Sequence, residues 1–314
     1  MRIAMNLGGD VLGRPSPPSE IVDDARRAEA EGFSSAWSVH FSRAYDALTT
    51  IAVAGAATER IELGVGIVPT YPRHPVALAQ QAATTQVFCG GRLTLGVGVS
   101  HRPVIEGLHG LPFTSPAAHM REYLAVLGPL LRGEEVSFRG EHYRVEGGIV
   151  VPGASPVSVV VGALSPGMVK VAGGLSDGVV TWLAGPRTLD DSIVPTLVAA
   201  AAAASRPQPR VVAGLPVAVT DDADQARAVA ETTFGRYGAL DNYLRLFERE
   251  GVASVGELAV VGTEAEVEKQ LQRYADVGVT ELWPVVYPVG AADADAAASI
   301  RRTRTLLIGL GGRT

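Results

Sequence analysis

Cysteine is almost absent from this sequence of 314 residues: Cys89 is the only one, so no disulfide can form within the chain. A lone thiol is typical of a reducing compartment, and we expect the protein in the cytoplasm. Lysine is nearly as rare, since Lys170 and Lys269 are the only two among 27 basic residues and arginine supplies the rest. With the abundance of alanine, glycine and valine, this bias indicates a GC-rich bacterial genome.

Long apolar runs are also missing. No stretch reaches the ~18 residues, free of charges and breakers, that a membrane-spanning helix needs. The net charge is -6 and the arginines form no basic stripe, which argues against nucleic acid as a partner. At 47% hydrophobic residues, the chain has enough apolar material for a large core. The expected partner is a small molecule, with no membrane and no nucleic acid.

Metal and nucleophile motifs are a third absence. The six histidines are never paired four residues apart with a glutamate between them, and acidic residues are nearly missing where strands are expected to end. We therefore predict no metal site. The chain also lacks the GxSxG elbow of serine hydrolases and the GxxxxGK[ST] phosphate loop.

Strand-like and helix-like segments alternate along the whole chain. Most strands read as continuous apolar runs, as buried parallel strands do. We count eight βα units and predict an α/β fold, a (β/α)8 TIM barrel formed by one domain over residues 1–314. An open, doubly wound parallel sheet is the alternative. The expected strands cover residues 2–7, 34–41, 61–68, 92–99, 156–164, 176–185, 209–219 and 280–289.

Two segments interrupt this alternation. Residues 134–148, after the fourth strand and its helix, alternate like a β-hairpin that turns at Gly140. Residues 247–262, after the seventh strand, are irregular. We predict that both are insertions and that they shape the substrate pocket.

The tetrapeptide LGVG occurs twice, at residues 63–66 and 95–98. The spacing of 32 residues is one βα unit. Consecutive strands of a barrel meet the same taper of its interior, and we expect small residues at that level of each strand. The repeat therefore supports the barrel, whose function is expected at the carboxyl ends of the strands.

The residues at those strand ends are mainly apolar and aromatic. They suit a flat heteroaromatic ring better than a sugar or a charged metabolite, and they include Trp37, Ile67, Val99, Leu164, Trp182 and Trp283. His40 ends the second strand, and Ser100 and His101 follow the fourth.

Two loops have the composition of anion-binding turns. GALSPGM, with Gly162, Ala163, Leu164 and Ser165, opens a helix with small residues whose free N–H groups can hold a phosphate. The next such turn, Leu183 to Arg187, adds a guanidinium. Both can also be ordinary turns before helices, but together they favour a ligand that carries a phosphate and brings its own chemistry.

The stretch GFSSAWSVHF (32–41), the run from Tyr45 to Arg102 that contains both LGVG copies, and the hairpin VSFRGEHYRVEG (136–147) resemble the bacterial luciferase-like superfamily. Within it, the chain is most similar to the branch that uses coenzyme F420, a deazaflavin. The resemblance implies a (β/α)8 barrel, a homodimer, and a deazaflavin held at the carboxyl ends of the strands. It also fits the genome type, since actinobacteria commonly make F420.

The resemblance further implies roles for single residues. The bond Gly66–Ile67 matches a bulge with a non-prolyl cis peptide behind the deazaflavin ring. His40 matches a histidine that some dehydrogenases use as a base, preceded here by Val39 where F420 enzymes often have aspartate. His101 stands where the glucose-6-phosphate dehydrogenases have a catalytic glutamate, which argues against their substrate. Arg187 replaces a lysine that contacts phosphate in relatives.

The implied function is an F420-dependent oxidoreductase, which transfers a hydride between C5 of the deazaflavin and a C=C, C=N or C=O group of a small substrate. His40 or His101 is the candidate for proton transfer, because a histidine of near-neutral pKa can give or take a proton. An FMN-dependent monooxygenase and a non-catalytic barrel that only binds a flavin or deazaflavin are the alternatives. The expected cofactor contacts are Asn6, Val39, Gly66, Ile67, Val99, Ser100, Gly162, Ala163, Leu164, Ser165, Leu183, Ala184, Gly185 and Arg187.

Overall fold

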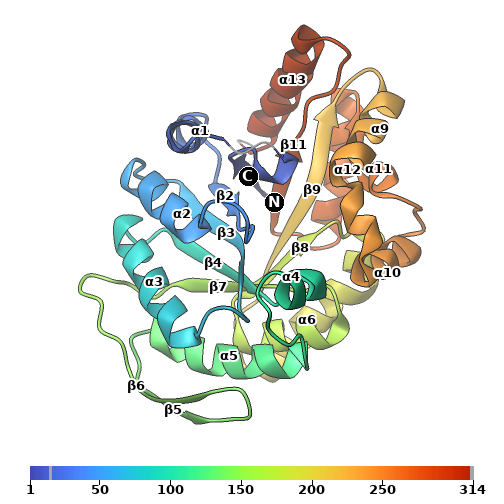
Figure 1. Cartoon of the computed structure of the whole chain (residues 1–314). Coiled ribbons are helices and arrows are strands. Elements are labelled where there is room, and N and C mark those ends of the chain that lie inside the picture. The colour runs from blue at the N-terminus through green and yellow to red at the C-terminus, as the bar shows by residue number, and fades with distance from the viewer. Residues whose placement is uncertain (14–15, 312–314) are drawn as a thin grey trace.

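A computed structural model describes residues 1–13 and 16–311, and the other five residues of the predicted domain lie outside the described ones. Within these ranges, eight parallel strands form a closed barrel, because β8 pairs with β9 as well as with β7. This confirms the predicted barrel and excludes the open sheet (Figure 1). The barrel strands are β1 (Arg2–Leu7), β2 (Ser35–Val39), β3 (Glu62–Pro69), β4 (Leu93–Gly98), β7 (Ser158–Gly162), β8 (Gly178–Trp182), β9 (Arg210–Val219) and β11 (Glu281–Val286).

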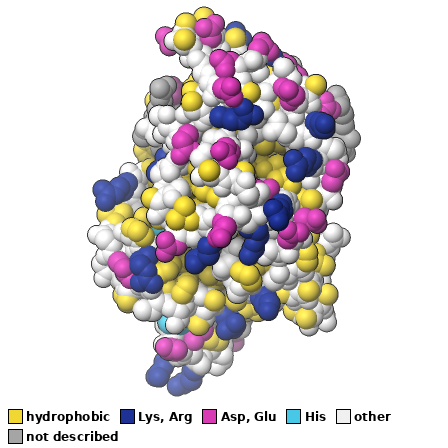
Figure 2. Space-filling model, turned by 90° about the vertical axis from the view of Figure 1, so that its right-hand side faces the viewer, with side chains coloured by type: hydrophobic (Ala, Val, Ile, Leu, Met, Phe, Trp, Pro, Cys, Tyr) yellow, Lys and Arg dark blue, Asp and Glu magenta, His cyan; other side chains and the backbone are white. Residues whose placement is uncertain are grey.

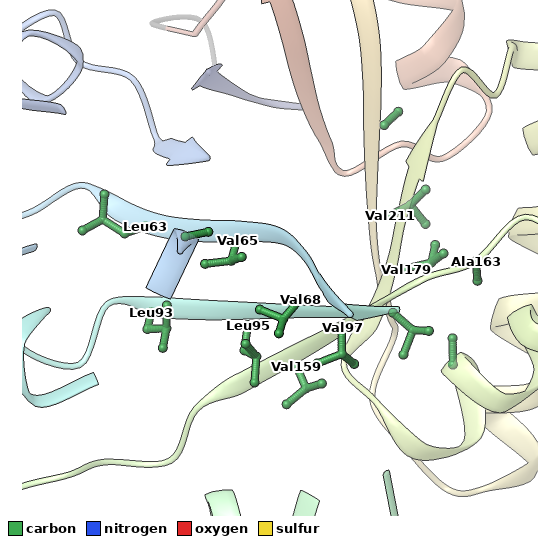
Figure 3. Close-up of a cluster of buried hydrophobic side chains, with 14 of the residues drawn as sticks. Leu63, Val65, Val68, Leu93, Leu95, Val97, Val159, Ala163, Val179 and Val211 are labelled. Atoms are coloured by element: carbon green, nitrogen blue, oxygen red, sulfur yellow. The ribbon is translucent and has the colours of Figure 1, made fainter. Parts of the chain in front are cut away.

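Helices surround this barrel and bury the outward-facing side chains of the strands. Figure 3 shows such side chains from neighbouring strands gathered in one cluster, with Leu63 and Val65 on β3 and Leu95 on β4. The surrounding helices are α1 (Pro18–Ala30), α2 (Ala47–Ala56), α3 (Pro75–Phe88), α5 (Pro116–Leu131), α6 (Pro166–Leu175), α8 (Val194–Ala203), α9 (Ala223–Phe234), α12 (Glu264–Asp276) and α13 (Asp293–Gly311). Short α7 (Pro186–Thr188) and a π-helical turn (Leu189–Ile193) lead into α8.

Two tryptophan rings fill the inside of the barrel. Trp37 and Trp283 stack with their ring centroids 5.5 Å apart. A Cβ at Gly64 would lie 2.2 Å from the Trp37 ring, and one at Gly66 would lie 2.5 Å from the Trp283 ring. The glycines of the first LGVG copy therefore make room for the indoles, since alternate residues of a strand face the same side.

The glycines of the second LGVG copy, on β4, make room for the neighbouring strand β3. A Cβ at Gly96 would meet the carbonyl oxygen of Val65 at 2.1 Å, and one at Gly98 would meet the Ile67 side chain at 2.5 Å. Small residues recur in both LGVG copies at positions that leave no room for a side chain. The reason is close contact with indole rings and with the adjacent strand.

A polar network lies at the amino ends of the strands. The Glu281 carboxylate is 1% exposed, and it accepts hydrogen bonds from Ser35, Trp37 and Arg210. Arg210 also pairs with Glu62 at 2.7 Å. Burial opposes ionisation of Glu62, but the charges of Arg210 and Arg2 hold its pKa below the usual value. A buried carboxylate needs such partners to stay ionised.

Both predicted insertions are present. Residues 134–148 contain the antiparallel pair β5 (Val136–Arg139) and β6 (Arg144–Gly147), which lies beside α5 at the edge of the molecule (Figure 1). Residues 247–262 contain α11 (Val255–Leu258) and β10 (Val260–Gly262), and β10 extends the sheet by pairing with the end of β9. Three further short helices cover the barrel mouth or border it: α4 (Arg102–Gly107), η1 (Asp10–Leu12) and η3 (Gly235–Ala239), the last leading into α10 (Asp241–Glu250).

We expect Gly96→Ala to destabilise the barrel, because its Cβ would have to displace the backbone of the neighbouring strand. Overpacking of this kind costs roughly 1–3 kcal/mol. Thermal unfolding followed by circular dichroism should show a lower melting temperature.

Gly174→Ala is the matched control, since no atom lies within 4 Å of a Cβ at that position of α6. Alanine should raise the melting temperature slightly there through its helix propensity. Equal melting temperatures for Gly96→Ala and the unsubstituted protein would contradict the packing role of the glycine.

Candidate active site

A cleft at the carboxyl ends of the strands consists of two adjoining cavities. The smaller chamber has a volume of about 370 Å³ and the larger about 590 Å³. Their common wall includes Gly66, Ile67, Ser100, His101 and Trp283. Residues that are far apart in the chain thus meet around one divided space, at the end of the barrel where the fold places its chemistry.

The predicted site residues separate between the two chambers. Val39 and His40 line only the smaller chamber, and Gly66, Ile67, Ser100 and His101 line both. The predicted residues that line only the larger chamber are Val99, Gly162, Ala163, Leu164 and Ser165.

The remaining predicted residues do not line either chamber, and these are Asn6, Leu183, Ala184, Gly185 and Arg187. Asn6 contacts a residue of the cleft wall, because its Oδ1 accepts a hydrogen bond from the indole N–H of Trp283 at 3.2 Å. Trp37, which the sequence placed among the strand-end aromatics, is fully buried inside the barrel.

The end of β3 has the predicted bulge. The Gly66–Ile67 peptide is cis, and the pairing of β3 with β4 changes register between Val65 and Val68. The Ile67 side chain lies against Gly98 and close to the Cβ position of Gly162. The bulge therefore forms an apolar surface shared by both chambers.

Ser100 follows β4 with a φ of 59°, in the left-handed region that residues other than glycine seldom adopt. Leu183 follows β8 in the same conformation, with a φ of 57°. Such residues need surroundings that hold them in place and cluster near functional sites. Ser100 borders both chambers and so lies in the wall of the cleft, whereas Leu183 does not line either chamber.

His40 lies beside the first turn of α2. Its Nδ1 accepts the backbone N–H of Ala47 at 3.3 Å, so the neutral ring carries its proton on Nε2. Burial lowers the pKa of His40 to about 4, and the positive charge of Arg73 acts in the same direction against Asp46. The near-neutral pKa expected from the sequence is therefore wrong for His40, which is neutral at pH 7.

His101 lies between two tyrosines that the sequence did not suggest. Its ring centroid is 5.9 Å from that of Tyr243 and 6.4 Å from that of Tyr237. Burial lowers the pKa of His101 below its usual value. Among the described residues, none forms a hydrogen bond with its ring nitrogens, so both remain available to a ligand.

The turn before α7 differs from its prediction as an open anion site. The backbone N–H groups of Arg187 and Thr188 donate to the Glu250 carboxylate at 3.2 and 2.9 Å. A Cβ at Gly185 would lie 2.2 Å from that carboxylate. The Arg187 side chain is 64% exposed and lies 3.6 Å from Asp191. A carboxylate of the chain itself thus occupies the position in which a ligand phosphate was expected.

The other predicted anion-binding turn faces the cleft. Ser165 precedes α6, makes no side-chain capping bond and lines the larger chamber. The free N–H groups of the first turn of a helix favour an anion in such a position. Contact of this turn with a phosphate stays a prediction.

The walls of the cleft come from unexpected segments. Described residues of 134–148 and 247–262 line neither chamber, so the prediction that these insertions shape the pocket is wrong. Instead α4, η3 and the start of α10 supply the outer walls, including Arg236, Tyr237 and Tyr243. In the sequence of these walls, FGRYGALDNY, the two glycines are the local signal that separates α9 from α10.

Charges of both signs are interspersed on the face of the molecule that Figure 2 shows. Among the residues that the structure describes, no helix combines the length and apolar character needed to cross a bilayer. Within the same residues, no group of three or more His, Cys, Asp or Glu side chains is arranged to hold a metal ion.

These features define a (β/α)8-barrel enzyme with an apolar, two-chambered cleft, a cis peptide in its wall and histidines at two strand ends. The sequence model described as luciferase-like monooxygenase matches residues 1–281. The chain therefore belongs to the luciferase-like monooxygenase family.

Similar proteins include members that use a deazaflavin. An F420-dependent glucose-6-phosphate dehydrogenase from Nakamurella multipartita is 30% identical over 270 residues, which cover 82% of this chain and 78% of that protein. The F420-dependent tetrahydromethanopterin reductase from Methanopyrus kandleri has a similar structure, with a TM-score of 0.79, 22% identity and coverage of 98% and 96% of the two chains. A monooxygenase from Streptomyces bottropensis also has a similar structure, with a TM-score of 0.75, 20% sequence identity and coverage of 99% of both chains.

We expect Arg73→Gln to raise the pKa of His40, because it removes a positive charge near the ring and releases Asp46 from its ion pair. The side-chain resonances of His40, assigned with a His40 variant, can be followed by NMR as the pH is lowered. The unsubstituted protein should titrate near pH 4 at this residue.

Arg132→Gln is the control, since that exposed arginine pairs with Glu134 away from the cleft and should leave His40 unchanged. The unfolded chain binds the histidine proton near pH 6.5, so this depressed pKa reduces stability as the pH falls from 6.5 towards 4. A His40 midpoint near 6.5 in the folded protein would refute the buried, neutral imidazole.

Proposed function

We propose that this protein is a coenzyme F420-dependent oxidoreductase that acts on a small organic substrate. The observation that carries the proposal is the divided cleft, in which the Gly66–Ile67 bulge and His101 border both chambers. The larger chamber collects most of the residues expected to contact a cofactor, while His40 faces only the smaller one. Family membership and the F420-dependent relatives support this assignment.

The larger chamber fits a flat deazaflavin. Glycines 66, 98 and 162 leave its inner wall without side chains, and Ile67 covers part of that wall. Ile67, Val99 and Leu164 would hold the ring through apolar contact, and Ser165 and the first turn of α6 would take the phosphate. When bound in its reduced form, F420 supplies a hydride to an electrophilic C=C, C=N or C=O group of the substrate.

His40 is suited to orient the substrate. Its neutral ring carries the proton on Nε2 and therefore offers a hydrogen-bond donor to a carbonyl oxygen. A pKa near 4 keeps the ring from becoming an imidazolium at neutral pH. A neutral donor of this kind polarises a carbonyl group without introducing a buried charge.

His101 is suited to move the proton. Its ring nitrogens have no hydrogen-bond partner among the described residues, so one of them can accept a proton from an alcohol or return it. The lowered pKa leaves the ring unprotonated and ready to act as a base at pH 7. His40 would thus act as the hydrogen-bond donor to the substrate and His101 as the base.

Cofactor titrations test this function. We expect F420 to bind with quenching of its fluorescence and FMN to bind much more weakly. Gly162→Val should weaken F420 binding, because a Cβ at this position would lie 3.3 Å from Ile67 and the two further methyl groups must occupy space beside the ring surface. Gly174→Ala, which lies away from both chambers, should leave the affinity for F420 unchanged.

Tight binding of FMN without binding of F420 would replace this proposal by the FMN-dependent monooxygenase. Binding of F420 without turnover of any enone, imine or quinone would support a barrel that only stores the cofactor. In a productive enzyme, His101→Ala should lower kcat for alcohol oxidation more strongly at pH 6 than at pH 9, where the substrate loses its proton more readily.

The protein is further proposed to work as a cytoplasmic homodimer. Val53 on α2 and Phe88 on α3 are 55% and 56% exposed, and these two helices pack side by side. Apolar side chains of this size on neighbouring helices suit contact with a second copy of the chain. We expect Phe88→Asp to shift the mass measured by light scattering towards the monomer.

Val198→Asp provides the control for the dimer, because Val198 is also exposed but lies on α8. It should leave the mass unchanged. A monomeric protein before any substitution would contradict the dimer and would leave the assignment of the cleft unaffected.

A further inference from the structure

One ionised side chain stands alone in the smaller chamber. Arg236, on η3, lines this chamber, and none of the described residues in the lining is an aspartate or a glutamate. His40 is neutral at pH 7 and burial lowers the pKa of His101. Arg236 is therefore the one charged side chain among the described residues that line this chamber.

The guanidinium of Arg236 is held by neutral groups. Nη1 donates to the carbonyl oxygen of Thr233 at 3.1 Å, and Nη2 donates to that of Val11 at 3.4 Å. Cζ lies 5.0 Å from the ring centroid of Tyr237 and 5.8 Å from that of Phe41. No carboxylate of the described residues forms an ion pair with Arg236. The side chain is exposed, and its charge has no carboxylate partner among the described residues.

Arg236 lies against a neighbour of each histidine. Phe41, 5.8 Å from Cζ, follows His40 in the chain, and the Tyr237 ring is 6.4 Å from the His101 ring. A group bound by Arg236 would place its neighbouring atoms in the chamber that both histidines line. The rest of that lining is largely apolar, with Val11, Val39, Phe41, Pro69, Val104 and Val285.

We infer that the substrate is a small planar molecule with an ionised carboxylate conjugated to its C=C bond, and that Arg236 binds this carboxylate. Two of the five guanidinium N–H groups donate to carbonyls, which leaves others for a carboxylate oxygen. The apolar lining suits the flat body of such a molecule. This inference rests on the proposed function, which assigns the smaller chamber to the substrate.

Reduction of the C=C bond of such a substrate needs one hydride and one proton. The carbon β to the carboxylate would gain a hydride from C5 of reduced F420, which would become oxidised F420. The α carbon would gain a proton from solvent, relayed through the ring of His101, which lines the same chamber. Arg236 draws electron density towards the carboxylate, which makes the β carbon a better hydride acceptor. Arg236 is therefore a specificity residue that also favours the transfer.

Cinnamate and cinnamamide test this inference, since they have nearly the same shape and differ in charge. Isothermal titration of each into the protein without cofactor should show tighter binding of cinnamate. In Arg236→Met, the ratio of the two dissociation constants should shift by roughly 10- to 100-fold against cinnamate, the effect of losing a hydrogen bond to a charged group. Arg236→Lys should retain part of the preference.

Arg249→Met is the matched control, because Arg249 is exposed on α10 and lines neither chamber. It should bind both ligands as the unsubstituted protein does. Circular dichroism and thermal melting confirm that each variant is folded before its titration is interpreted.

Equal weakening of cinnamate and cinnamamide in Arg236→Met would overturn the inference, since a merely structural arginine affects both ligands alike. Loss of F420 affinity in this variant with an unchanged cinnamate preference would also overturn it, because the guanidinium would then hold the cofactor. Failure of the unsubstituted protein to bind F420, together with an Arg236-dependent preference for cinnamate, would refute the proposed function and support the anion site.

Discussion

The packing of two indole rings inside a closed barrel determines much of this structure. Trp37 and Trp283 stack in the interior, where a protein has no room for overlapping atoms. The facing positions of β3 are glycines, because any Cβ there would overlap a ring. The carboxyl end of the barrel is consequently lined by bare backbone on one side and by Trp283 on the other.

That arrangement leads directly to the cleft. Because Gly98 on β4 and Gly162 on β7 carry no side chains, Ile67 can lie across the ends of these strands and form a wall common to both chambers. Trp283 faces the core and also borders the two chambers. At the opposite end of the barrel, Glu281 binds Trp37 and Arg210 and so anchors the same ring stack to a buried ionic network. Core and site are therefore one continuous packing unit.

The electrostatics of the cleft depend on where the chain places its own charges. Glu250 neutralises the amide groups before α7, while the turn before α6 keeps its amides free. Arg73 and burial keep His40 neutral, and burial acts in the same direction on His101. Arg236 then remains as the one charged side chain among the described residues that line the smaller chamber. The two chambers therefore differ in charge, since Arg102, Asp241 and Arg245 line the larger one and Arg236 lines the smaller one.

The sequence by itself determined the barrel, the hairpin insertion and the position of the bulge, because these features depend on local apolar runs, turn residues and a family pattern that spans adjacent residues. Only the tertiary structure decided that Glu250 covers the turn at Arg187, that Arg236 enters the smaller chamber and that the two insertions stay outside the cleft. It also decided the charge of His40, since desolvation and a neighbouring guanidinium are properties of surroundings that a linear sequence does not contain. Contacts between segments 60 or more residues apart arise from the closure of the barrel, which brings every strand end to one mouth.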